Sequence, residues 1–149
     1  MVQIIVAIVV QKRLRAANNR PQIKEEIMMG YESKIYVVRK SNFNGTGEKK
    51  FAEKIAEFNL CKVYGVSNIL RNMPKTNCYI YADDGNTEII EDEYGEELTE
   101  CTPAELLEII ENEKQKDDFG YWRYDMILAT LRELVKLKDE RLYCLHFGY

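Results

Sequence analysis

The sequence predicts a two-layer α+β domain, and three observations support this prediction. Strand-like and helix-like stretches come in groups, in the order β-α-(α)-β-β-β-α-α-β, which is typical of helices packed against an antiparallel or mixed sheet. Hydrophobic residues make up 46% of the 149 residues, which is enough to build a core. Asp84-Gly85 and Glu93-Tyr94-Gly95 are turn sequences between the middle strands. We expect a single domain over residues 29–149, with about four to five strands and two to three helices.

The start of this domain is predicted to hold a strand, a loop and a helix. Lys34–Lys40 is rich in β-branched residues and alternates weakly, which favours a strand. Ser41–Gly47 has the composition of a loop. Glu48–Leu60 is predicted to be an amphipathic helix, because its apolar side chains recur at helical spacing. These side chains are Phe51, Ile55 and Phe58, with Ala52 and Ala56 between them.

A short second helix is expected next. Gly65 is the expected stop of the first helix, since glycine tolerates the left-handed conformation found at helix ends. Ser67–Met73 then has a capping residue in Ser67. Pro74 disfavours helical backbone in the residue before it, so the short helix should end there.

A β-hairpin is the clearest local signal. Cys78–Ala82 and Thr87–Glu91 flank Asp84-Gly85, the favoured dipeptide for a two-residue turn in which both residues have positive φ. This turn predicts three cross-strand pairs: Ile80 with Ile89, Tyr79 with Ile90 and Tyr81 with Glu88. The turn at Glu93-Tyr94-Gly95 should then lead into a short third strand near Glu97–Glu100.

Two helices and a strand complete the prediction. Thr102-Pro103-Ala104-Glu105 is a capping box that starts a helix running to about Lys116. Its expected inner face is Leu106, Leu107, Ile109 and Ile110. A second helix is expected over Tyr121–Lys138, and Leu142–Phe147 reads as the last strand. The inner face of the second helix is predicted to be Trp122, Met126, Ile127, Leu131, Leu134 and Val135.

Charge is segregated along the chain. Between Thr76 and Glu113 there are thirteen Asp and Glu residues and no Lys or Arg, whereas residues 1–75 hold fourteen basic residues against six acidic ones. Such an acidic block projects a negative field, which disfavours direct contact with nucleic acid or with an anionic membrane. A positively charged protein groove is the partner that suits it. The sequence thus predicts a protein partner and does not predict a chemistry.

The predicted partner-binding residues lie on the hairpin and on the turn after it. They are the carboxylates Asp83, Asp84, Glu88, Glu91, Asp92, Glu93, Glu96 and Glu97, with Tyr79, Tyr81 and Tyr94 as aromatic anchors. Duplex DNA carries a negative charge about every 1.7 Å of its axis, so a dense carboxylate array can occupy a DNA-binding groove. We expect a non-enzymatic protein that binds and inhibits a nucleic-acid-binding enzyme of its host. A solvated acidic face with only local roles is the simpler interpretation.

Two other functions remain open. Asp83, Asp84 and Glu88 offer oxygen ligands for a hard cation, as in a small carboxylate-metal hydrolase. Their order does not match an EF-hand loop, and the acidic block contains no Lys. Alternatively, the aromatic surface is buried in a homodimer or larger homo-oligomer of an accessory protein without catalytic function. No cofactor and no metal is predicted for the leading function.

His146 is the only histidine, and it lies two positions from Cys144 on the expected last strand. A Cys–His nucleophilic pair would be available if these side chains met each other and Cys78. Leu142, Cys144 and His146 share one strand face, which favours a histidine packed in the core instead.

A glycine-rich stretch and a basic cluster precede the hairpin. Gly45-Thr46-Gly47-Glu48-Lys49-Lys50 lacks the spacing of a Walker phosphate loop, so a loop that leads into a helix is sufficient explanation. The flanking basic residues offer a weak RNA- or DNA-binding signal with Phe43 as a stacking ring, and a solvated helix face is the default interpretation. These basic residues are Arg39, Lys40, Lys49, Lys50 and Lys54.

Residues 1–28 are expected to lie outside the natural protein. Lys24–Met28 can be encoded by AAG GAG GAA ATA ATG, which contains a purine-rich ribosome-binding sequence just before a start codon. Translation would then start at Met28 or Met29, in a bacterial or phage gene. The alternative is an ordinary helix-surface run of Lys24, Glu25 and Glu26. The basic residues near the start follow the apolar run instead of preceding it, which is the wrong order for a signal peptide. The Cys residues are scattered, so we expect a cytoplasmic protein with reduced thiols.

Three segments carry a resemblance: MGYESKIYVV (Met29–Val38), CYIYADDGNTEI (Cys78–Ile89) and LHFGY (Leu145–Tyr149). They resemble segments of small uncharacterised proteins encoded by phages and prophages of low-GC Gram-positive bacteria, and the resemblance covers nearly all of 29–149. It implies a mobile-element protein in the cytoplasm of a bacterial host, and it supplies no catalytic residues. Size and acidity are also similar, by class and not by motif, to anti-defence proteins such as anti-CRISPR proteins. An RNA-guided nuclease is therefore among the expected targets.

Overall fold

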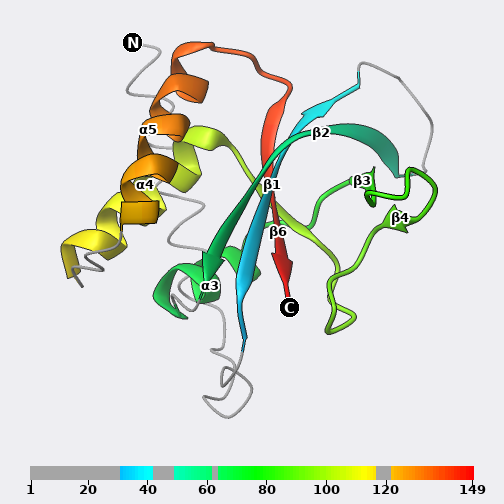
Figure 1. Ribbon diagram of the computed structural model, residues 1–149, viewed down its shortest axis with the longest axis horizontal. Coiled ribbons are helices and arrows are strands. Elements are labelled where there is room, and N and C mark those ends of the chain that lie inside the picture. The colour runs from blue at the N-terminus through cyan, green and yellow to red at the C-terminus, as the bar shows by residue number, and fades with distance from the viewer. Residues whose placement is uncertain (1–30, 42–48, 62–63, 117–121) are drawn as a thin grey trace.

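The computed structural model describes residues 31–41, 49–61, 64–116 and 122–149. These residues form the mixed α+β fold that the sequence predicts, with three helices and a six-stranded sheet in place of four to five strands (Figure 1). The elements are β1 (Ser33–Lys40), β2 (Lys50–Cys61), α3 (Tyr64–Arg71), β3 (Cys78–Tyr81), β4 (Glu88–Ile89), β5 (Thr99–Cys101), α4 (Pro103–Lys116), α5 (Trp122–Lys136) and β6 (Leu142–Gly148). The expectations for residues 1–28, for most of the Ser41–Gly47 loop and for Phe43 concern residues outside the described ranges.

The sheet has the strand order β4-β3-β2-β1-β6-β5, with β1 near its centre. β1 pairs antiparallel with β2 on one side and with β6 on the other, so the first and last described strands are neighbours. β2 and β3 run parallel but share only two pairs, Lys50 with Cys78 and Phe51 with Tyr79. This short parallel contact is where the sheet turns away from its centre toward the β3–β4 hairpin on the right of Figure 1.

The predicted helix over Glu48–Leu60 is wrong, because this stretch forms β2. A β-bulge interrupts this strand. Val37 pairs with Ala56 while Val38 pairs with Lys54, so the ladder skips Ile55. One extra residue reverses which face of the sheet the later side chains occupy. The apolar pattern that suggested a helix does not follow burial: Phe51 and Ile55 are 40% and 50% exposed, whereas Ala52 and Leu60 are buried on opposite faces of the sheet.

The helix before Pro74 also differs from its prediction. α3 begins at Tyr64, so Gly65 lies inside the helix and does not stop one, and Ser67 lies mid-helix and does not cap it. A Cβ at Gly65 would meet only the end of the flexible Glu113 side chain on α4, so this helical position does not require glycine. The helix does end before Pro74, as predicted.

The helices cover one face of the central strands and bury the larger hydrophobic cluster (Figure 1). The capping box is confirmed: the Glu105 amide donates to Thr102 Oγ1 and the Thr102 amide donates to Glu105 Oε2, each at 3.2 Å. On α5, the predicted inward positions Met126 and Val135 are instead 59% and 37% exposed. The cluster takes its buried residues from the sheet and from all three helices: Ile35, Val37, Leu60, Val66, Leu70, Leu106, Ile109, Ile110, Ile127, Leu131 and Cys144, among others.

A second, smaller cluster lies on the opposite face of the sheet. It contains Tyr36, Val38, Ala52, Cys78, Ile80, Leu98 and Leu145, so the β3–β4 end of the sheet curls over the central strands. The predicted pairs of Ile80 with Ile89 and of Tyr81 with Glu88 are confirmed, whereas Ile90 lies beyond the end of β4. Of the two turn residues only Gly85 has positive φ, at 72°, so the turn is not the predicted two-residue type.

Candidate partner-binding surface

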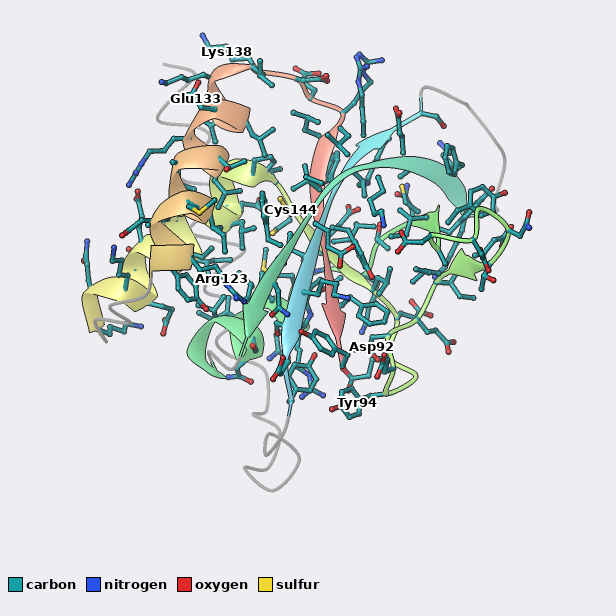
Figure 2. All side chains as sticks on the ribbon, viewed as in Figure 1. Asp92, Tyr94, Arg123, Glu133, Lys138 and Cys144 are labelled. Atoms are coloured by element: carbon teal, nitrogen blue, oxygen red, sulfur yellow. The ribbon has the colours of Figure 1, made fainter. Side chains whose placement is uncertain are left out.

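Residues 83–97, which we call the acidic segment, contain the turn and second strand of one hairpin and the whole of a second hairpin. The first is the β3–β4 hairpin, on the side of the sheet away from α4 and α5 (Figure 1). The second turns at Asp92–Glu96, where the Asp92 amide donates to the Glu96 carbonyl at 2.8 Å. Figure 2 shows Asp92 and Tyr94 beside the end of β6, and the Glu93 amide donates to the Gly148 carbonyl at 3.1 Å.

Both carboxylates at the tip of the first hairpin have partners within the fold. Asp84 Oδ1 accepts hydrogen bonds from the amides of Asn86 and Thr87, each at 2.8 Å. The hydrogen bond from the Thr87 hydroxyl, followed by these two amide bonds, lowers the pKa of Asp84. Lys54 Nζ lies 2.9 Å from Asp83 Oδ1 and lowers the pKa of Asp83 through its hydrogen bond and its charge. Asp84 therefore shapes the turn, and Asp83 forms an exposed ion pair of small energetic value.

Asp92 shapes the second turn in the same way. Its Oδ1 accepts hydrogen bonds from the Tyr94 amide at 2.9 Å and the Glu96 amide at 3.0 Å. Gly95 has φ 74°, which confirms the turn expected at Glu93-Tyr94-Gly95. Burial raises the pKa of Asp92, and the two amide bonds oppose that rise. Asp92 is thus a half-buried structural carboxylate and offers little surface to a partner.

A stack of three side chains fastens this second turn to the core. The ring of Tyr94 stacks on the buried ring of Tyr31, with centroids 5.1 Å apart, and the guanidinium of Arg71 lies 4.7 Å from the Tyr31 centroid. Arg71 Nη2 and Nε also bind the two carboxylate oxygens of Glu96, at 2.5 and 3.2 Å. Glu96 and Tyr94 were both predicted to bind a partner, and the structure gives both a role in folding, although Tyr94 keeps 49% of its surface exposed.

The remaining four carboxylates have no such role. Glu88, Glu91, Glu93 and Glu97 are exposed, and none forms an ion pair with another described residue. Glu91 and Glu97 are moreover partners in an antiparallel bridge, which places two negative side chains opposite each other. Opposed like charges on paired strands are destabilising, so folding gains nothing from this pair.

An aromatic trio lies at the β2–β3 junction. Phe51, Tyr79 and Tyr81 have ring centroids 5.3 to 5.9 Å apart, with tilted or edge-on planes. Phe51 is 40% exposed and the two tyrosines are half-buried. Glu88 is the cross-strand partner of Tyr81, so a free carboxylate adjoins the trio. Tyr79 and Tyr81 were predicted as anchors, but Phe51 was missed, because it had been assigned to the inner face of a helix.

His146 is a core histidine, as the alternation of β6 favours. It is 5% exposed, and its Nε2 lies 2.9 Å from Ser33 Oγ, which in turn lies 2.6 Å from Ser67 Oγ of α3. Burial, with the nearby charges of Arg71 and Lys75, lowers the pKa of His146 from 6.5 to about 3. Cys78 and Cys144 belong to different clusters on opposite faces of the sheet, so the Cys–His arrangement with Cys78 does not form.

Three of the five residues of the basic cluster form ion pairs within the fold, and two of the three proposed metal ligands, Asp83 and Asp84, have local partners. Arg39 pairs with Asp139 at 3.2 Å and Lys40 with Glu100 at 2.7 Å, in addition to the Lys54–Asp83 pair. In the part of the chain that the structure describes, no group of three or more His, Cys, Asp or Glu side chains is placed to hold a metal ion. No helix among these residues is long and apolar enough to cross a membrane.

Comparisons with known proteins leave this surface to be interpreted from its geometry. No family model matches the chain, and no curated protein or solved structure matches it either. The geometry separates the carboxylates that serve the fold, such as Asp84, Asp92 and Glu96, from those that do not.

Proposed function

We propose that this chain is a non-enzymatic binding protein that docks its acidic segment onto a basic, nucleic-acid-binding surface of a host protein. The facing pair of Glu91 and Glu97 carries this proposal, because it places like charges together on an exposed surface and no described cation forms an ion pair with either carboxylate; Lys75 Nζ donates only to the Glu97 backbone carbonyl, at 3.4 Å. Repulsion between facing carboxylates lowers the stability of the fold. Such a loss, with no stabilising contact in return, is expected where the charges serve binding. A positively charged partner would supply the missing counter-charge.

The division of the acidic segment supports the same proposal. Asp84, Asp92 and Glu96 hold the two turns in place, and this fixes the positions of the free carboxylates between them. Preformed charges of one sign steer an oppositely charged partner and set specificity more than they add affinity. Tyr94, half-exposed and clamped on Tyr31, can serve as a rigid anchor with little entropy to lose on binding.

The partner class follows from the charge density of the segment. Surfaces that bind nucleic acid are strongly positive and are built to neutralise closely spaced phosphates. The channel of an RNA-guided nuclease is one such surface. Together with the resemblance to phage-encoded proteins, this supports an inhibitor that competes with nucleic acid, of the anti-CRISPR type.

A matched pair of charge reversals tests the proposal. One variant carries Glu91→Lys and Glu97→Lys, and the control carries Glu133→Lys and Glu140→Lys, which change the net charge equally. Figure 2 shows Glu133 on α5, far from Asp92. The tagged full-length chain is used to capture partners from a nuclease-treated bacterial lysate, and the affinity of the captured protein is then measured with purified components.

The proposal predicts a captured nucleic-acid-binding protein that duplex DNA or RNA displaces and that added salt weakens. The Glu91/Glu97 variant should lose binding by tenfold or more at low salt, while the Glu133/Glu140 variant should bind within about twofold of the native chain. Equal losses in both variants would mean that only net charge matters. An unchanged affinity in the first variant would exclude the acidic segment as the binding surface.

A further inference from the structure

We infer that the aromatic trio of Phe51, Tyr79 and Tyr81, with Glu88 beside it, receives an arginine side chain of the basic partner. This inference rests on the proposed function and names the contact that would anchor it. The trio lies outside the second cluster, because the neighbouring residues Ala52, Cys78 and Ile80 are the ones buried there. Side chains alternate along strands, so the three rings point to the other face.

That other face is the one that the helices cover at the centre of the sheet. α4 and α5 lie over the central strands, and the β3–β4 end extends away from them (Figure 1). The rings of the trio therefore continue the apolar face of the sheet past the end of its helical cover. A contiguous apolar patch at such a place is typical of an interaction site, whereas a single exposed ring is not.

The surroundings of the trio favour a cation as its ligand. Aromatic ring faces carry a negative quadrupole, and the exposed carboxylate of Glu88 stands opposite Tyr81 across the hairpin. A hydrogen bond with Tyr81, followed by burial and by the charges of Tyr81 and Glu88, raises the pKa of Tyr79, so its hydroxyl stays neutral. No described cation pairs with Glu88, which leaves its carboxylate available to a guanidinium.

The chain's own cations show which of its rings are already occupied. Lys40 Nζ lies 3.8 Å from the centroid of Tyr143, and Lys34 Nζ lies 4.9 Å from that of Tyr149. Across the described residues, rings with a Lys or Arg over them are Tyr31, Tyr36, Tyr143, Phe147 and Tyr149. The three rings of the trio are not among them, although they form the largest group of mutually contacting aromatic side chains on the described surface.

Arginine fits this site better than lysine does. Its planar guanidinium can stack on a ring and at the same time donate two hydrogen bonds to a carboxylate, whereas the ammonium of lysine is compact and strongly hydrated. Nucleic-acid bases also stack on aromatic platforms, but the unpaired carboxylate of Glu88 would repel the attached phosphates. The geometry therefore points to arginine, and the test must distinguish arginine from lysine and from single-stranded nucleic acid.

The test uses the full-length chain and three fluorescent probes measured by anisotropy. The probes are an oligo-arginine peptide, an oligo-lysine peptide of the same length, and a single-stranded oligothymidine. Tyr81→Leu and Tyr79→Leu each remove one ring, and Tyr143→Leu is the control, because Lys40 already covers that ring. Circular dichroism establishes that each variant is folded.

The native chain should bind the arginine peptide more tightly than the lysine peptide. Each trio variant should reduce arginine binding by about two- to fivefold, leave lysine binding unchanged, and differ from Tyr143→Leu. Equal affinity for the two peptides, or failure to bind either, would overturn the inference. Oligothymidine that binds more tightly than both peptides and is lost in Tyr81→Leu would also overturn it, in favour of base stacking.

The two proposals fail in different ways. Reversal of the charges of Glu91 and Glu97 should lower the affinity for both peptides to a similar extent, because it changes the electrostatic field of the surface and leaves the aromatic rings in place. If that reversal has no effect while Tyr81→Leu abolishes the preference for arginine, the acidic segment is wrong as the docking surface and the arginine site stands. If the reversal weakens both peptides and Tyr81→Leu changes nothing, the arginine site is wrong and the docking surface stands.

Discussion

Lowering the pH from 6.5 to about 4.5 is expected to weaken the fold through His146. The imidazole lies 5% exposed among Ser33, Ser67 and the core, and its pKa is lowered from 6.5 to about 3. In the unfolded chain the same imidazole is solvated and takes up a proton near pH 6.5. Below that pH the unfolded state therefore binds more protons than the folded state, and stability falls as the pH falls.

The magnitude follows from the two pKa values. Well inside the window between pH 6.5 and pH 3, each pH unit changes the free energy of unfolding by about 1.4 kcal/mol. Integrated from pH 6.5 to about pH 4.5, with allowance for partial protonation at the upper end, the contribution of His146 is a loss of about 2 kcal/mol. Below about pH 3 the folded state also takes up the proton, and the loss stops growing.

A variant isolates this contribution from that of the carboxylates. His146→Gln keeps a polar group that can reach the Ser33 hydroxyl but cannot titrate. Urea unfolding of both proteins at pH 6.5, 5.5 and 4.5 gives the free energy of unfolding at each pH. Because Asp92, Asp83 and the other carboxylates titrate in both proteins, the difference between the two curves reports His146 alone.

The native chain should lose about 2 kcal/mol more than His146→Gln over this range. A difference that stays constant from pH 6.5 to 4.5 would show that His146 takes up a proton in the folded state, and the buried, neutral imidazole would then be the wrong description. A native chain that instead gains stability relative to His146→Gln as the pH falls would reverse the sign of the argument and refute it as well.

Three substitutions test the packing that positions the acidic segment. Glu96→Ala should lower the free energy of unfolding in urea by about 2–3 kcal/mol, because the Arg71 side chain is 4% exposed and loses its carboxylate partner. The loss stays below the about 3–5 kcal/mol of a fully buried pair, since the Glu96 side chain is 39% exposed. Gly148→Ala should cost about 1–3 kcal/mol in the same assay, because its Cβ would overlap the Tyr31 hydroxyl, and native stability would disprove that close contact. Thr102→Ala should cost about 1 kcal/mol and lower the melting temperature, whereas an unchanged temperature would show that the capping box contributes nothing.

Local signals in the sequence predicted the parts of the fold that local chemistry decides. The capping box at Thr102 predicts the start of α4, because its hydrogen bonds join residues only three apart. The register of Ile80 with Ile89 follows from a turn centred at Asp84-Gly85, whichever turn type the backbone adopts. Prediction fails at β2, because its apolar residues recur at helical spacing while its strand conformation is set by pairing with β1 and, further along the chain, with β3.

The candidate site shows the same limit. Its composition is readable from the sequence, but the role of each residue depends on partners far away in the chain. Tyr94 is held by Tyr31, and Glu96 by Arg71, across separations that no pattern in the sequence encodes. Phe51 could be placed with Tyr79 only once the short parallel pairing of β2 with β3 was known.

These long-range partners divide the acidic segment in a way that a mutational scan can test. Changing each carboxylate to its amide, one at a time, should affect stability where the fold uses the charge and partner affinity where it does not. The first class is Asp84, Asp92 and Glu96, and the second is Glu88, Glu91, Glu93 and Glu97. Because Glu91 and Glu97 repel each other, the amide at either position should leave the chain as stable or slightly more stable, by about 0.2–1 kcal/mol. A variant that gains stability and loses its partner would show that this repulsion is retained for binding, whereas a loss of stability at both positions would show that the pair belongs to the fold.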